Sequence, residues 1–223
     1  MSGLTRYQTA LAAALGAAAS GGADQAALAG MSEQGIAVTG RVRRSWCIGR
    51  ARQAAPLTLS ALPEAQREEL LTRWVDAGGG TNSFFETESE ALLAFLAERI
   101  EPDSDAMALC RFERAVIRAR TAGPSAPSTE LDAAVTLERS PDADIVTLDA
   151  PIDALLAAID GTGPWPAPRT DPQHLLIAPG VDGLVRPADA REMAVWRAAE
   201  LGVCAGLPGA RELFACGALR VRS

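Results

Sequence analysis

The chain has 223 residues and a formal net charge of -7, with 48% hydrophobic residues and only 4% aromatic ones. Its length is sufficient for one large domain or two small ones that bury a core without crosslinks. The acidic balance argues against tight nucleic-acid binding, which would need a basic face concentrated against the overall charge.

The first expected element is an amphipathic helix over residues 1–19. Leu4, Tyr7, Leu11 and Leu15 recur at helical spacing, and polar residues interrupt the uniformly apolar stretch that a signal peptide needs. No apolar run approaches the roughly 20 residues that span a bilayer. We therefore expect a cytoplasmic protein that does not contact a membrane.

Helical spacing continues through the first half of the chain. Pro63 is suited to the first turn of a helix whose apolar face lies at residues 70–75, and residues 78–80, all Gly, end it. Apolar stripes then predict a helix around residues 92–100 and another from about 104 to 120. Two overlapping capping-box candidates precede the first of these: Ser83 with Glu86, and Thr87 with Glu90.

A linker is expected at residues 122–129, where Gly123, Pro124 and Pro127 interrupt all periodicity. It divides the chain into a helical domain, residues 1–121, and a second domain, residues 130–223.

Short apolar runs in the second domain predict two β-hairpins. One joins residues 134–137 to 145–148 around Ser140-Pro141-Asp142, and the other joins 175–177 to 184–185. The remaining expected elements are helices at 152–159, 188–201 and 208–216, and a closing strand at 218–221. Helix, helix, strand is a winged-helix order, so the predicted fold class is α+β, a helical domain followed by a small mixed winged-helix-like domain.

Candidate catalytic chemistry is sparse. His174 is the single histidine, so a site that needs two imidazoles is excluded. Residues 78–81, Gly-Gly-Gly-Thr, lack the Gly-Lys-Ser/Thr ending of a phosphate-binding loop. The cysteines are far apart, without zinc or redox spacing, and free buried thiols are expected: Cys47, Cys110, Cys204 and Cys216. We predict no catalytic residue and no metal site in this chain.

The segment from Arg41 to Arg52 is a candidate recognition surface, because five Arg flank Trp46 within an otherwise acidic chain. Arg and Trp are enriched at the centres of protein interfaces. A solvated helix face with a core Trp explains the same residues equally well. Glu113 is expected on the apolar side of its helix, and we predict that it pairs with Arg43 or Arg44.

Residues 130–160 carry eight acids against one base, Arg139, which makes the first predicted hairpin a poor surface for DNA or RNA. An exposed hairpin edge can instead accept an extended peptide as an added strand. The candidate peptide-binding residues on it are Val135, Leu137, Ile145 and Thr147.

Several strings, taken together, resemble one family: residues 44–51, RSWCIGRA; residues 57–63, LTLSALP; residues 79–85, GGTNSFF; and residues 108–113, ALCRFE. They resemble the MbnC-like proteins of methanobactin biosynthesis and their TglI-like relatives in other ribosomal-peptide pathways. The resemblance covers the helical half well and the second half only by element order.

The resemblance implies a non-catalytic partner subunit that forms a heterodimer with a barrel-fold, multinuclear non-heme iron oxidase. The iron belongs to the other chain, and the substrate is a Cys-containing precursor peptide whose leader the second domain binds. The expected binding residues in the helical half are Arg43, Arg44, Trp46, Arg50, Phe84 and Phe85. Two alternatives remain: a winged-helix DNA-binding regulator, and a small hydrolase or transferase with an unrecognised carboxylate site.

Overall fold

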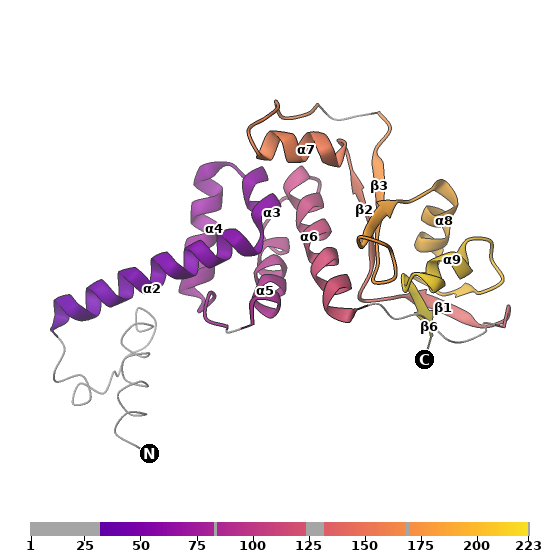
Figure 1. The fold of residues 1–223 in the computed structure, drawn as a ribbon, viewed down its shortest axis with the longest axis horizontal. Helices are drawn as coiled ribbons and strands as arrows, with labels where there is room; N and C mark the ends of the chain where they lie inside the picture. The colour runs from indigo at the N-terminus through magenta and orange to yellow at the C-terminus, as the bar shows by residue number, and fades with distance from the viewer. Residues whose placement is uncertain (1–31, 83, 124–131, 168–169, 223) are drawn as a thin grey trace, which may run out of the picture. The chain divides into compact units, whose positions relative to one another are not determined.

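The computed structural model describes residues 32–82, 84–123, 132–167 and 170–222. Within these ranges the fold is α+β, with eight helices and six strands, and the N-terminal part is helical (Figure 1). Contacts group the chain into two compact units, Met1–Ala54 with Glu64–Glu88, and Ala55–Pro63 with Ser89–Ser223.

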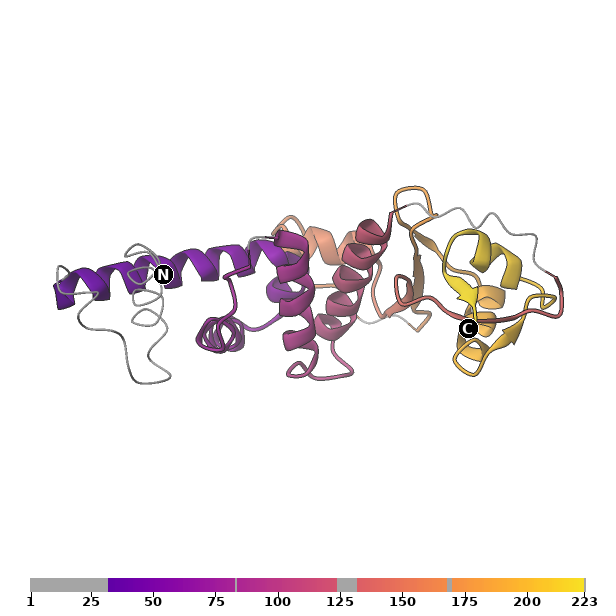
Figure 2. The same ribbon diagram turned by 90° about the horizontal axis from the view of Figure 1, so that it is seen from below.

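The first unit contains α2 (Glu33–Ala54), α4 (Glu64–Asp76) and the first turn of α5 (Phe85–Ala97). Helix α2 is continuous over its 22 residues (Figure 2). Before its first turn, the Ser32 hydroxyl accepts a hydrogen bond from the amide of Gly35, at 3.1 Å.

The predicted stop after α4 is confirmed. Gly78 has a positive φ of 92°, which ends the helix without the steric cost that a side chain would add. A Cβ at Gly79 would lie 2.0 Å from the ring of Trp74, and one at Gly80 would lie 2.5 Å from the Cβ of Cys47. Gly79 therefore allows close packing against Trp74 of the preceding helix α4, and Gly80 allows it against Cys47 of α2.

The second unit begins with α3 (Pro56–Ala61) and continues with α6 (Asp105–Ala122). Helix α6 starts where predicted, because the hydroxyl of Ser104 accepts from the amide of Met107 at 3.2 Å and caps the helix. Helix α3 was not expected, although Pro56 stands at its first turn, where the fixed φ of proline favours helix formation.

Two antiparallel three-stranded sheets follow. The first has the order β5-β1-β6, from Val203–Cys204, Thr136–Arg139 and Leu219–Val221. The second has the order β2-β3-β4, from Asp144–Leu148, Gln173–Ile177 and Val185–Pro187.

The prediction of a first hairpin, between residues 134–137 and 145–148, is wrong. Strand β1 pairs with β5 on one side and with β6 on the other, so both of its edges are occupied and β2 joins the other sheet. The turn at Ser140 connects two sheets, and the amide of Ser140 donates to the carbonyl of Ala218 at 2.9 Å. The second predicted hairpin is confirmed, because β3 and β4 are antiparallel neighbours.

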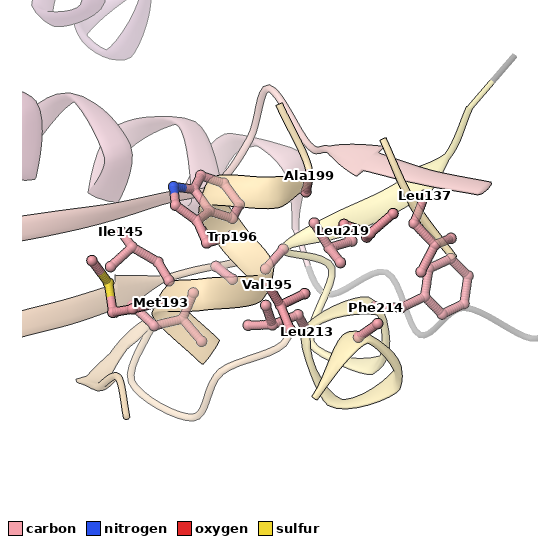
Figure 3. Packing of buried hydrophobic residues seen from close by; sticks show 14 of the residues in the cluster. Leu137, Ile145, Met193, Val195, Trp196, Ala199, Leu213, Phe214 and Leu219 are labelled. Atoms are coloured by element: carbon pink, nitrogen blue, oxygen red, sulfur yellow. The ribbon is translucent and has the colours of Figure 1, made fainter. Parts of the chain in front are cut away.

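Both faces of β2 and β3 are covered, which follows from the alternation of side chains along a strand. Ile145 and Leu176 belong to the cluster packed by α8 (Ala190–Ala198) and α9 (Ala210–Ala215), which Figure 3 shows from close by. Val146 and Leu175 face the other way, into a cluster that includes Leu109 of α6 and Leu155 of α7 (Ile152–Ile159).

Other predicted elements differ in detail. Helix α7 has the predicted bounds, whereas α8 and α9 are shorter than expected and strand β5 lies between them, so the order after β4 is helix, strand, helix, strand. Helix α5 begins at Phe85, which places Thr87 inside the helix, so it cannot cap it. Ser83, the helix expected at 1–19 and most of the linker expected at 122–129 lie outside the described residues.

The grouping by contacts differs from the predicted division at residues 122–129. Helix α6 lies N-terminal to that linker, yet it contacts β2 and β3 and belongs to the same compact unit. The domain boundary at 122–129 stays a prediction.

Candidate interaction surfaces

An exposed apolar stripe runs along α2. Val38, Val42 and Trp46 are 43%, 65% and 56% exposed, and they follow one another at intervals of four residues. Residues at this spacing are neighbours on one face of a helix. Trp46 was predicted from the sequence and the two valines were not, although the same four-residue spacing identifies them.

Arg50 stands at the next four-residue step and holds the aromatic end of the stripe in place. Its guanidinium carbon lies 4.8 Å from the ring centre of Trp46 and 5.8 Å from that of Phe85. The same group donates to Glu88 at 2.7 Å and to the carbonyl of Asn82 at 2.9 Å. Three of the predicted residues, Trp46, Arg50 and Phe85, are therefore brought together.

Among the described residues of the first unit, Arg50 and Glu88 form a buried ion pair. Only 4% of the Glu88 side chain and 19% of the Arg50 side chain is exposed. A carboxylate this deeply buried needs a charged partner, since desolvation without one costs several kcal/mol. The pair therefore orders the exposed rings beside it.

Phe84 and Phe85 extend the exposed surface at the start of α5. They are 72% and 40% exposed, and the amide of Phe84 donates to the side-chain oxygen of Asn82 at 3.0 Å. We call the following set the aromatic face: Val38, Val42, Trp46, Phe84 and Phe85.

The remaining arginines of α2 differ in their partners. Arg44 pairs with Asp76, and this hydrogen bond lowers the pKa of the Asp76 carboxyl and raises that of the guanidinium. Arg52 pairs with Glu68 at 2.6 Å. Arg41 and Arg43 have no acidic ion-pair partner among the described residues.

Glu113 has other partners than the predicted Arg43 or Arg44, which corrects that hypothesis. Its carboxylate accepts from the amides of Leu57 and Thr58 at 2.8 and 2.9 Å and from the Thr58 hydroxyl at 2.5 Å. These donors stand at the first turn of α3, where amides lack partners inside the helix and a negative charge is favoured. Burial nonetheless raises the pKa of Glu113, against the effect of these hydrogen bonds.

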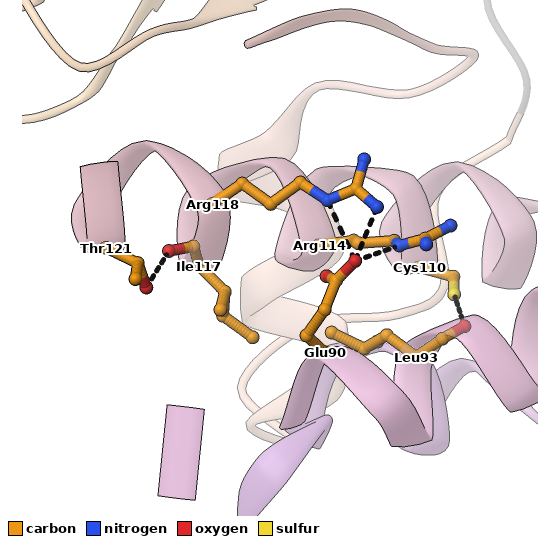
Figure 4. A network of polar contacts seen from close by, with 7 residues as sticks. All are labelled: Glu90, Leu93, Cys110, Arg114, Ile117, Arg118 and Thr121. Atoms are coloured by element: carbon orange, nitrogen blue, oxygen red, sulfur yellow. Dashed lines mark hydrogen bonds and ion pairs between the residues drawn. The ribbon is translucent and has the colours of Figure 1, made fainter. Parts of the chain in front are cut away.

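A second polar cluster joins α5 and α6 within the second unit (Figure 4). One carboxylate oxygen of Glu90 accepts from Arg114 at 2.8 Å and from Arg118 at 2.5 and 2.8 Å. Nearby, the Cys110 thiol donates to the carbonyl of Leu93 at 3.3 Å, and burial raises its pKa to about 11. These contacts fasten two helices together.

The predicted peptide-binding residues divide into two kinds. Leu137 and Ile145 are 0% and 4% exposed and belong to the core, and Val135 packs against the same core. Thr147 is partly exposed, and its hydroxyl lies 3.0 Å from Nδ1 of His174 on the neighbouring strand. The alternation of side chains along β1 and β2 therefore directs the apolar ones among these residues into the core.

A groove of about 510 Å³ lies beside that Thr147–His174 pair in the second unit. The residues that line it come from the start of β3, the end of β4 and one face of α8: Asp171, Pro172, Gln173, His174, Pro187, Ala188, Ala190, Met193, Ala194 and Arg197. This groove was not predicted from the sequence, although the spacing of residues 190, 193, 194 and 197 indicates a single helix face. We call it the α8 groove.

Within the described ranges, no group of three or more His, Cys, Asp and Glu residues could hold a metal ion. The helices in those ranges also include none long and apolar enough to cross a bilayer. A scan against models of protein families gives no match, and no curated protein sequence matches the chain.

Proposed function

We propose that the chain is a non-catalytic partner subunit that docks a barrel-fold multinuclear non-heme iron oxidase and presents the leader of a Cys-containing precursor peptide to it. The family resemblance suggests this role. The observation that supports it most strongly is the aromatic face, where Trp46 and Phe85 stay exposed although both rings contact the Arg50 guanidinium.

An ordered and exposed apolar surface fits a protein interface. Trp, Phe and Arg are enriched at such interfaces, and anchors that are already ordered lose little side-chain entropy on binding. A contiguous exposed apolar patch, unlike a single exposed residue, is typical of an interaction site. We therefore assign oxidase docking to Trp46 and its neighbours, with Arg43 and Arg44 at the border of the contact.

We infer that the second unit is winged-helix-like, and we assign peptide binding to its strands. Among the residues that the structure describes, β4 and β6 each have one neighbour in their sheets, so their outer edges can accept a further strand. Main-chain hydrogen bonds would give affinity for an extended leader with little demand on its side chains. In this account the iron and the oxygen chemistry belong to the oxidase, and this chain supplies binding and orientation.

Co-expression of the full chain with a candidate multinuclear non-heme iron oxidase tests this function. Size-exclusion chromatography and iron analysis of the shared peak should show a one-to-one complex whose iron travels with the oxidase. A chain that elutes alone and without iron contradicts the proposal. Salt-sensitive binding to duplex DNA would favour the regulator instead, and turnover by the isolated chain would favour an enzyme.

A further inference from the structure

A pocket of about 400 Å³ lies beside strand β6, within the second unit. Its walls come from four parts of the chain: the end of α6, the turn between β1 and β2, the loop after β3, and the segment from α9 to β6. We call it the β6 pocket. Its volume is within the range of sites that bind small organic molecules.

Backbone hydrogen bonds join three of these wall segments to one another. The amide of Ser140 donates to the carbonyl of Ala218 at 2.9 Å, and the amide of Gly180 donates to the carbonyl of Cys216 at 2.9 Å. A Cβ at Gly180 would lie 3.0 Å from the backbone of Cys216, so the loop and the end of α9 approach each other closely. The walls are therefore held together by the fold itself, and a ligand would bind at little cost in ordering the chain.

Apolar side chains make up much of the wall: Pro141, Pro179, Phe214, Leu219 and Val221. Phe214 and Leu219 belong to the core cluster of this unit, which fixes their positions (Figure 3). Val221, in contrast, is 48% exposed. These side chains favour a ligand with an apolar body, because burial of its surface removes apolar area from water.

Two charged side chains line the pocket, and they differ in their partners. Arg220 donates to Glu138 on the neighbouring strand β1 at 2.7 and 2.8 Å, so its charge is already paired. Asp142 has neither an ion-pair partner nor a hydrogen-bond donor to its carboxylate among the described residues, and only its amide is engaged, with the Ser140 hydroxyl at 3.3 Å. The unpaired carboxylate beside apolar walls favours a ligand that carries a positive charge on an apolar body.

We propose that the β6 pocket binds a small organic cation, a primary amine on an aromatic or aliphatic body. The ammonium group pairs with the carboxylate of Asp142, and the apolar body lies against Phe214 and Leu219. This site goes beyond the proposed function and does not rest on it, because it needs neither an oxidase nor a precursor peptide.

Titration of the full chain with phenethylamine and with cyclohexylmethylamine, followed by the NMR shifts of the backbone amides, tests the proposal. Saturable shifts are expected at Asp142, Gly217 and Val221. Phenethyl alcohol and 3-phenylpropionate have a similar apolar body with a neutral and a negative end group. Both should bind about tenfold or more weakly than phenethylamine, because neither forms an ion pair with Asp142.

Two variants with matched controls locate the ligand. Asp142→Asn should weaken phenethylamine binding about tenfold, whereas Asp149→Asn should leave it unchanged, since Asp149 is exposed and does not line the pocket. Ala122→Trp should block binding, because the indole fills the pocket. Ala215→Trp is its control, an exposed alanine of the same unit outside the pocket.

The proposal is overturned if neither amine gives saturable shifts, if the alcohol binds as tightly as phenethylamine, or if Asp142→Asn binds like wild type. Equal melting temperatures of Ala122→Trp and Ala215→Trp show that lost binding is not lost folding. None of these outcomes bears on oxidase docking, which the co-expression experiment tests separately.

Discussion

The guanidinium carbon of Arg50 lies 4.8 Å from the ring centre of Trp46, and the same guanidinium donates at 2.7 Å to Glu88, whose side chain is 4% exposed. One residue thus neutralises a buried charge and supports an exposed indole. Stability and recognition are coupled through it.

Replacement of Arg50 by Met should lower the free energy of unfolding by about 3 kcal/mol, because it leaves the buried Glu88 carboxylate without a partner. Urea unfolding measures the change. Arg44→Met is the control, since Arg44 and Asp76 are 41% and 55% exposed and such a pair contributes about 1 kcal/mol or less. Equal losses in the two variants would contradict the buried role of Arg50.

Glu113 should make stability depend on pH in a defined direction. Its pKa is raised in the folded state, chiefly by burial, so the unfolded chain loses this proton at lower pH than the folded one. Folding then favours the protonated form of Glu113. Its contribution to the free energy of unfolding is lost as pH rises from the ordinary carboxyl pKa through the raised pKa of the folded state.

The measurement compares wild type with Glu113→Gln, whose amide oxygen can still accept hydrogen bonds. Wild type should lose stability relative to this variant as pH rises across that window. A constant difference would show that the hydrogen bonds from Leu57 and Thr58 balance the effect of burial on the pKa, and a reversed one would show that they outweigh it. Glu113→Ala should cost about 1–3 kcal/mol at any pH in the window, because buried amides lose their acceptor.

The four thiols should differ in reactivity. Burial raises the pKa of Cys110 to about 11, and it raises the pKa values of Cys47 and Cys216 as well, whereas Cys204 is exposed. Thiolate is the reactive form, so a disulfide reagent should modify Cys204 first in the native chain. Cys204→Ser should remove the fast phase, and a fast phase that persists would contradict the assignment.

The helices were predictable from sequence where local signals decide the structure. Ser104 marks the start of α6, and the apolar run from Ile152 to Ile159 gives the bounds of α7. Strand pairing depends on partners that are distant in sequence. Leu137 pairs with Val203 and Val221, which no local pattern near Ser140 reveals, and so the first hairpin was predicted wrongly.

The candidate surfaces were likewise predictable only where the signal is local in the sequence. Trp46 and its arginines form an unusual local cluster that the sequence displays directly, and its link to Phe85 depends on how α2 and α5 pack. Glu113 was correctly expected on a buried face. Its partners are backbone amides, and a backbone amide leaves no mark in a residue pattern.

Docking through the aromatic face is tested most directly by calorimetric titration of the purified oxidase with three forms of this chain: wild type, Trp46→Ala and Trp165→Ala. Trp165 is 45% exposed and lies outside the aromatic face, so its replacement matches the chemical change. Trp46→Ala should weaken binding by about 2 kcal/mol or more, whereas Trp165→Ala should leave it within about 0.5 kcal/mol of wild type. Equal affinity of all three forms would contradict docking through this face.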